Sequence, residues 1–328
     1  VYPYRTASEG LKWLSLGLLF VLAAHVFADP TLRRAFGRAL VWFLFVVCVF
    51  GLIQNFTSTG LLYWTIPVTL GRIFGPFVNA NHFTILLELV IPTAALLVVR
   101  AGEQRLIYAG VLMILIAAVV VCASRMGIVL VAVETALVLG FLALKRRHPK
   151  ETRARRVGIA ATAVVLMAAV VGLVFTNRGV AVRFEEEQPY QVRWTVAQAT
   201  WKLFLARPWT GYGAGTFDQV YPSANPVDTG LFWSHAHNDP LQFAMEWGVI
   251  GPAALLWILW LLWRGRWTQD QWLRAVLPVT VVLIHSWVDF PLQIPAVAAA
   301  WLLVLAMLPA AGKPESASAA PPLSAGQP

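Results

Sequence analysis

Apolar runs of roughly 18 residues recur along this chain, which is the length that a helix needs to cross the hydrocarbon core of a bilayer. The residues are 59% hydrophobic and 12% charged, and the mean hydropathy is +0.68. A soluble domain carries about 25% charged residues, so this composition excludes an ordinary soluble protein. The sequence therefore predicts a membrane protein that crosses the bilayer several times.

The predicted spans are helices, because every backbone polar group in lipid must be bonded internally and the alternating pattern of a barrel is absent. We expect an all-α, polytopic helical bundle with nine spans in this sequence. The spans are predicted at Leu11–Ala28, Leu40–Phe56, His82–Val99, Leu106–Cys122, Gly127–Leu144, Val157–Phe175, Val249–Trp263, Val276–Val288 and Val297–Leu308.

A basic segment of twelve residues, Lys145–Arg156, carries seven Lys or Arg and sets the predicted orientation. Short basic loops remain in the cytoplasm, so this segment is placed inside. The other strongly basic stretches then fall on the same side, namely Arg33, Arg34, Arg38, Arg100, Arg105, Arg264, Arg266 and Arg274. The net charge of +9 is thus explained by membrane orientation, and no nucleic-acid partner is predicted.

This orientation divides the chain into four parts. Residues 1–175 hold six spans, 176–247 form one long extracytoplasmic loop, 248–309 hold three spans, and 310–328 form a disordered tail rich in Pro, Ala and Ser. The chain begins at Val1 and enters an apolar segment directly, so we expect further spans upstream. The two cysteines, Cys48 and Cys122, predict neither a disulfide framework nor a cysteine-rich metal site.

The long loop has features of a folded segment. Apolar residues recur at helical spacing between Tyr190 and Leu205, and Arg207-Pro208 ends that predicted helix. A glycine-rich turn with Gly211, Gly213 and Gly215 follows, where the backbone can approach another segment or a ligand closely. It is neither a P-loop nor a dinucleotide-binding turn, because the required Lys and the strand–helix context are missing.

A dense polar cluster ends the loop and contains His235, His237, Asn238, Asp239 and Glu246. One interpretation is a solvated loop end, and the other is a catalytic or binding cluster at the membrane surface. A histidine followed by Asn and Asp suits a general base. Two further chemistries are weaker: a metal site lacks a third ligand at matching spacing, and a serine hydrolase lacks a GxSxG elbow.

Three arginines on the outer side are not explained by the orientation rule: Arg72, Arg125 and Arg193. They are either snorkelling or surface residues, or they bind an anion, because a guanidinium matches phosphate oxygens bidentately. Asn79 or Asn81 is predicted to cap the helix that follows, beside His82. Acidic residues inside spans are functional candidates by default, and the sequence holds Glu88 and Glu134 at such positions.

Four motifs in this order resemble the O-antigen ligase and polymerase superfamily, a group of bacterial membrane enzymes that includes relatives acting on proteins. The motifs are GPFVNANHF at Gly75–Phe83, SRMG at Ser124–Gly127, the stretch from RW to RPWTGYGAGTF at Arg193–Phe217, and HAHNDPLQFAMEWGVIG at His235–Gly251. No single motif is specific, but the ordered set with one long loop before the last spans is.

The resemblance implies a GT-C-like helical fold in the bacterial inner membrane, with the loop in the periplasm. It implies a metal-independent, inverting glycosyltransferase that needs no cofactor. The implied donor is a glycan on undecaprenyl pyrophosphate, and the implied acceptor is lipid A-core, another lipid-linked glycan or a protein serine. The ligase, polymerase and protein-transferase alternatives stay open.

The resemblance also implies roles for individual residues. Arg125 and Arg193 match the pyrophosphate-contacting arginines, and Arg72 is a further candidate. His237 matches the catalytic base, with His235 as the alternative because the histidine is doubled. Supporting roles fall to Asn238, Asp239, Glu246, Asn81 and His82.

Two other functions remain as alternatives. A transporter of lipid-linked sugars would place its polar groups near the bilayer midplane on broken helices, whereas here they gather at the outer edge. A non-catalytic scaffold would use the long loop to bind a partner.

Overall fold

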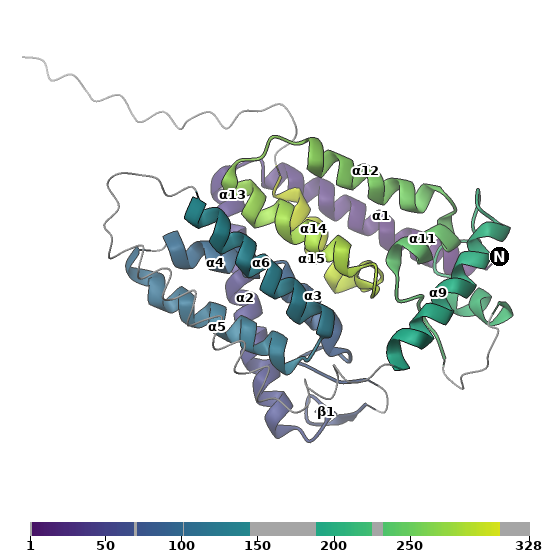
Figure 1. Ribbon diagram of the computed structural model, residues 1–328, viewed down its shortest axis with the longest axis horizontal. Helices are drawn as coiled ribbons and strands as arrows, with labels where there is room; N and C mark the ends of the chain where they lie inside the picture. The colour runs from purple at the N-terminus through teal and green to yellow at the C-terminus, as the bar shows by residue number, and fades with distance from the viewer. Residues whose placement is uncertain (1, 69–70, 101, 145–187, 225–231, 309–328) are drawn as a thin grey trace, which may run out of the picture.

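The computed structural model describes residues 2–68, 71–100, 102–144, 188–224 and 232–308, and Figure 1 shows their arrangement. The described part is almost entirely helical, which confirms the all-α prediction. The short strands β1 (Leu61–Leu62) and β2 (Ile66–Pro67) pair antiparallel in the connection after the second helix. The predicted basic loop at 145–156, the predicted span at 157–175 and the predicted tail at 310–328 lie outside the described residues.

The helices follow one another with short connections. Their bounds are α1 Pro3–Val26, α2 Pro30–Thr57, α3 Ala80–Glu88, α4 Ile91–Arg100, α5 Arg105–Val121, α6 Arg125–Leu144, α9 Gln188–Ala206, α10 Phe217–Val220, α11 Asp239–Trp247, α12 Ile250–Arg264, α13 Gln269–Gln271, α14 Leu277–His285 and α15 Pro295–Ala306. Single tight turns η1 (Gly102–Gln104), η2 (Tyr221–Ser223) and η4 (Pro291–Gln293) and a π-helical turn η3 (Trp272–Val276) complete them.

The prediction of nine complete spans goes beyond what the structure shows. Three helices of the described chain are long and apolar enough to cross a membrane: α1, α2 and the segment Gly102–Val121. The helices α3 and α4 together form a fourth candidate that is bent by 42°, and α12 and α15 are shorter apolar helices. Hydropathy overestimates spans here because residues buried in protein are as apolar as residues facing lipid; every residue of α4 before Arg100 is buried.

The second helix begins ten residues before the predicted span at Leu40, at Pro30. Asp29 caps it by accepting a hydrogen bond from the Thr31 N–H at 2.7 Å, and proline suits the first helical position. Arg33, Arg34 and Arg38 therefore lie on the first turns of α2 and not in a preceding loop. A helix holds such side chains at fixed positions, which a loop does not.

The core of the bundle lies around α4, which packs against α2, α5 and α6. The helix α1 packs along α15, so the first and last parts of the described chain lie side by side. Exposed apolar side chains cover the outside of α1, α2 and α12, among them Leu22, Phe43 and Trp263. Such a surface suits contact with lipid and confirms the assignment to a membrane.

The long loop folds against one end of the bundle, at the right of Figure 1. The helix α9 confirms the predicted helix at 190–205 and packs across α11. Its apolar side holds Val196, Ala199 and Leu203, which pack with Phe217 and Met245 in a small second core. The loop is therefore a folded unit that can hold side chains in place.

Candidate active site

The histidine loop, residues 234–238, is tied to the connection between α14 and α15. Asn238 caps α11 by accepting the Leu241 N–H at 2.9 Å, and its own amide donates to the Trp287 carbonyl at 2.9 Å. The Asp239 N–H donates to the Ser286 carbonyl at 2.8 Å. The buried Asp239 carboxylate accepts the Leu292 N–H at 2.8 Å. Both predicted supporting residues thus hold two distant segments in register.

This register brings Asp289 between two histidines. The His237 Nδ1 atom lies 3.5 Å from the Asp289 carboxylate, and the His82 Nε2 atom lies 3.7 Å from the same oxygen. His82 stands in the first turn of α3, so the site joins three segments that are far apart in sequence. The Asp289 side chain is buried, whereas the His237 side chain is 20% exposed and can meet a substrate.

The Phe290 ring packs against all three histidines of the site. Its centroid lies 4.6 Å from the His82 ring and 4.7 Å from the His237 ring, both in edge-on geometry. The His235 ring stacks on it at 4.3 Å with an interplanar angle of 3°. Such contacts fix ring orientations, since offset-stacked and edge-on arrangements are the favoured ones.

The electrostatics favour an ionised aspartate. Burial by itself raises the pKa of Asp289, but hydrogen bonding with His237 and His82 and the charge of Arg193 outweigh burial, so this pKa lies well below its usual range. An ionised carboxylate beside His237 favours a proton on Nδ1 of that ring. The lone pair on Nε2 is then available to accept a proton, which is the geometry of a histidine base oriented by a carboxylate.

His235, the alternative base, differs from His237. Burial, followed by the neighbouring charges of His237 and His82, lowers the pKa of His235 to about 4. Its Nδ1 atom lies 3.0 Å from the Ser234 hydroxyl. A ring that is stacked flat and so weakly basic makes a poor general base at neutral pH, because the best catalytic pKa lies near the working pH.

The backbone at His237 is in the left-handed region, with φ of 51°. This conformation costs a residue other than glycine about 1–2 kcal/mol. The hydrogen bonds of the two following residues, Asn238 and Asp239, hold the chain in it. Strain of this kind gathers at functional sites, where the surrounding contacts fix the geometry.

Arg193 connects α9 to the same site. Its Nη1 atom donates to the Val288 carbonyl at 2.8 Å, directly before Asp289. A guanidinium has five N–H donors, and this bond uses one of them. The half-buried side chain thus both holds the Asp289 segment and places a positive charge beside the histidines.

Arg72 and Arg125 lie on the adjoining wall around α3. Arg125 is the first residue of α6 and is half-buried. A side chain at Gly127 would come within 2.2 Å of Thr84, so the beginnings of α3 and α6 lie against each other. The Arg72 carbonyl accepts the Ala80 N–H at 2.7 Å, at the start of α3. Pyrophosphate binding by the three arginines stays a prediction.

The predicted cap of α3 is confirmed for Asn79 and not for Asn81. The Asn79 side chain accepts the Asn81 N–H at 2.9 Å, and its amide nitrogen lies 3.4 Å from the His82 Nε2 atom. Asn81 therefore contributes its backbone to the cap, and its side chain does not supply it.

The glycine-rich turn contacts the chain's own helix α11. The Tyr212 N–H donates to the Met245 carbonyl at 3.0 Å, and the Gly213 N–H donates to the Glu246 carbonyl at 2.9 Å. Gly211 has φ of +62°, and a Cβ atom there would lie 2.3 Å from the Glu246 carbonyl oxygen. Glycine is required because the two backbones touch.

Two buried side chains extend this contact to the histidine loop. The Glu246 carboxylate accepts the Gly215 N–H at 2.8 Å and the Gln242 amide at 2.9 Å. The Gln242 side-chain oxygen in turn accepts the Ala236 N–H at 3.0 Å, between the two loop histidines. Burial raises the pKa of Glu246 to about 7, although these hydrogen bonds partly oppose the shift.

A second polar contact lies inside the bundle. The His285 Nδ1 atom lies 2.8 Å from the Glu88 carboxylate, and both side chains are buried. Glu88 is the last residue of α3, at the bend before α4. Both carboxylate oxygens of the fully buried Glu134 lack a hydrogen-bond partner among the described residues. The sequence indicated the two acids but not the histidine that joins them.

The sequence interpretation missed Asp289, Phe290 and Gln242. Asp289 follows a short apolar helix in the stretch SWVDFPLQIP, and the usable signal was an acid at the outer edge of a predicted span. Phe290 and Gln242 carry no signal without the fold. Among the described residues, no group of three or more His, Cys, Asp or Glu is arranged to hold a metal ion.

Residues 110–256 match the sequence profile of a family described as O-Antigen ligase. The matched segment contains Arg125, Arg193 and the whole histidine loop, and it ends before Asp289. No curated protein matched the chain.

Proposed function

Because residues 110–256 place this chain in the O-antigen ligase superfamily, a group of ligase- and polymerase-type membrane glycosyltransferases, we propose that it transfers a glycan from undecaprenyl pyrophosphate. The acceptor is a hydroxyl of lipid A-core or of a growing surface polysaccharide. The reaction takes place on the periplasmic face of the bacterial inner membrane and inverts the anomeric centre. The observation that carries the proposal is the pairing of half-exposed His237 with the buried carboxylate of Asp289.

In the proposed step, the Nε2 atom of His237 takes the proton of the acceptor hydroxyl while the acceptor oxygen attacks the anomeric carbon. The bond between that carbon and the pyrophosphate oxygen breaks, and undecaprenyl pyrophosphate leaves with the electron pair. One displacement of this kind inverts the configuration. The Asp289 carboxylate stabilises the imidazolium that forms, as in other histidine bases paired with an aspartate.

The leaving group carries the developing negative charge, which fixed cations stabilise without reorganisation. We assign this role to Arg193 and Arg125, with Arg72 as a further contributor. Guanidinium groups bind phosphate oxygens bidentately, so they can do this without a divalent ion. His82 shares the Asp289 carboxylate and helps to keep it oriented.

A transfer assay with the purified full chain tests the proposal. The donor is a synthetic polyprenyl-pyrophosphate glycan, and lipid A-core, a lipid-linked glycan and a serine peptide are offered in turn. We expect transfer to one acceptor in the presence of EDTA and loss of transfer in His237→Ala. The matched control is His25→Ala, which removes an exposed histidine from α1. Full activity of His237→Ala, or strict dependence on a divalent ion, would contradict the proposal.

A second candidate is transport of the lipid-linked sugar. One observation favours it: Glu88 and His285 pair at a bend in α3–α4, and broken helices with buried polar groups are typical of transporters. Liposomes that hold the chain and a labelled donor, without acceptor, distinguish the two functions. Movement of donor between leaflets without any glycosyl transfer would favour transport.

A further inference from the structure

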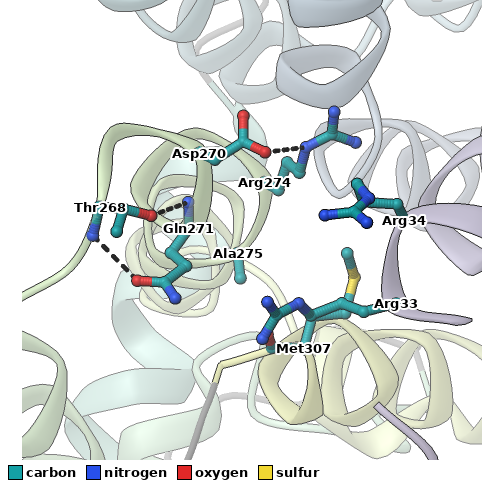
Figure 2. Close-up of a pocket in the computed structure, with 8 residues that line it drawn as sticks. All are labelled: Arg33, Arg34, Thr268, Asp270, Gln271, Arg274, Ala275 and Met307. Carbon is teal, nitrogen blue, oxygen red and sulfur yellow. Dashed lines mark hydrogen bonds and ion pairs between the residues drawn. The ribbon is translucent and has the colours of Figure 1, made fainter. Parts of the chain in front are cut away.

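A pocket lined by three arginines lies at the other end of the bundle. Figure 2 shows its lining residues, which come from the start of α2, from the segment around α13 and η3, and from the end of α15. The helix α12 separates the two sites: it begins beside α11 and ends at Arg264, and its 15 residues span about 22 Å. The lining residues are Arg33, Arg34, Thr268, Asp270, Gln271, Arg274, Ala275 and Met307.

Arg274 is the most buried of these arginines, with 9% of its surface exposed. Its Nε atom donates to the Asp270 carboxylate at 3.2 Å. Its Nη1 atom is buried and has no hydrogen-bond partner among the described residues. A buried charged nitrogen without a partner is costly, so this atom indicates a missing anion or hydrogen-bond acceptor.

The charges around the pocket do not balance. Asp270 is the single acid among the described lining residues, and it is shared between Arg274 and Arg100. Arg33 and Arg34 add two further cations from adjacent positions on α2, and Arg38 lies close enough to act on Arg274 electrostatically. One carboxylate therefore faces several guanidinium groups.

The orientation rule explains why this end of the bundle is basic, but it does not explain the pocket. Charges that set orientation act from exposed loops and need no defined geometry. Here a capping box fixes the Thr268–Gln271 turn, with Thr268 Oγ1 accepting the Gln271 N–H at 3.3 Å. The Arg33 Nη1 atom also lies 3.5 Å from the Met307 carbonyl, which ties α2 to the end of α15.

We propose that this pocket binds a phosphate group, supplied by the headgroup of an anionic phospholipid or by free phosphate. Converging guanidinium groups match phosphate oxygens, and basic pockets at the ends of membrane helices hold phosphorylated headgroups. The pocket also adjoins apolar surface that a lipid chain can cover, since Leu32 beside it is 48% exposed. A bound phosphate would hold the start of α2 against the α13–α15 end of the bundle.

Binding is tested on the delipidated full chain with two variants of equal charge. The pocket variant is Arg33→Gln with Arg34→Gln, and the control is Arg264→Gln with Arg266→Gln, two exposed arginines outside the pocket. Native mass spectrometry measures retained phosphatidylglycerol against phosphatidylcholine, and thermal unfolding measures the effect of inorganic phosphate. We expect the pocket variant to bind phosphatidylglycerol about fivefold more weakly for each Arg removed.

Each outcome decides the proposal. Selective retention of phosphatidylglycerol that the pocket variant loses and the control keeps supports a lipid headgroup. A phosphate-dependent rise in Tm that only the pocket variant loses, with no preference between the two lipids, supports free phosphate. Equal losses in both variants would show a diffuse basic surface and overturn the site, and so would the absence of both effects.

Discussion

The Nδ1 atom of His237 lies 3.5 Å from the carboxylate of Asp289, although one residue ends the long loop and the other follows α14. The hydrogen bonds of Asn238 and Asp239 to the 286–292 segment make this approach possible. The site therefore depends on two segments that are joined by the folding of α12–α14. An activity assigned to the loop alone would lack the carboxylate that orients its histidine.

We expect Asp289→Asn to reduce glycan transfer by about hundredfold to ten-thousandfold, the range that general acid–base catalysis contributes. An amide in place of the carboxylate no longer stabilises a protonated His237, and it favours the wrong ring tautomer. The measurement is kcat for transfer. Donor KM should change little, because Asp289 is buried beneath the histidines and not exposed to substrate.

The matched control for that prediction is Asp218→Asn, which changes a loop aspartate that pairs with Arg5 instead of a histidine. It should retain transfer close to the unmodified level. Equal activity in the two variants would remove Asp289 from the mechanism and leave His237 without its proposed partner.

Local sequence patterns predicted the parts of this molecule that local physics determines. The helix at 190–205 followed from apolar spacing and the Arg207-Pro208 stop, and the structure has α9 there. The cap at Asn79 and the importance of the 235–246 stretch followed in the same way. Each of these depends on residues within a few positions of one another.

The remaining features depend on contacts between distant segments. Asp289 gains meaning only when the fold places it beside His82 and His237. The nine predicted spans were too many because hydropathy does not distinguish a helix buried among others, such as α4, from one that faces lipid. The partner of Glu88 was likewise invisible, because His285 lies on another helix.

Stability should fall as the pH rises from 5 to 8, and Glu246 should cause part of this fall. Burial raises the pKa of Glu246 from 4.5 to about 7. A carboxyl group whose pKa is higher in the folded protein stabilises fully below its unfolded pKa, and this contribution is lost as the pH passes the folded pKa. Thermal unfolding in detergent at several pH values measures the slope.

In Glu246→Gln the side chain is neutral at every pH, so this part of the slope should disappear. The control is Glu103→Gln, an exposed acid in the turn before α5, which should leave the slope unchanged. An unaltered pH slope in Glu246→Gln would contradict the assignment.

Gly211→Ala should lower stability by at least about 2 kcal/mol, because it combines an unfavourable left-handed backbone with a clash. The added Cβ atom would lie 2.3 Å from the Glu246 carbonyl oxygen, which is too close for any side-chain carbon. The measurement is Tm. Gly10→Ala is the control: nothing lies within 4 Å of its Cβ position in α1, and alanine favours a helix, so Tm should hold or rise. Equal Tm values in both variants would show that the glycine turn is not in contact with α11.

Gln242→Leu should lower kcat about tenfold while donor KM stays similar, because the change leaves the buried Ala236 N–H without its acceptor and loosens the histidine loop. Gln242→Glu keeps an oxygen acceptor for Ala236 and should recover part of the rate. Gln198→Leu on the exposed side of α9 is the control and should behave as the unmodified chain. Equal losses of kcat in Gln242→Leu and Gln198→Leu would point to a general effect on folding and remove the positioning role.

Arg193 offers the sharpest separation between binding and positioning, because its guanidinium both donates to the Val288 carbonyl and adds charge beside Asp289. Arg193→Lys keeps the charge but not the forked geometry, and Arg193→Gln loses both. If Arg193 binds pyrophosphate, donor KM should rise in Arg193→Lys and kcat should fall further in Arg193→Gln, since the developing charge on the leaving group then loses a cation. Lys202→Gln removes an exposed charge on α9 and should leave both constants unchanged. If Arg193→Lys and Arg193→Gln lower kcat equally at unchanged KM, the arginine acts through Val288 and Asp289 alone, and pyrophosphate binding must be assigned to Arg72 and Arg125.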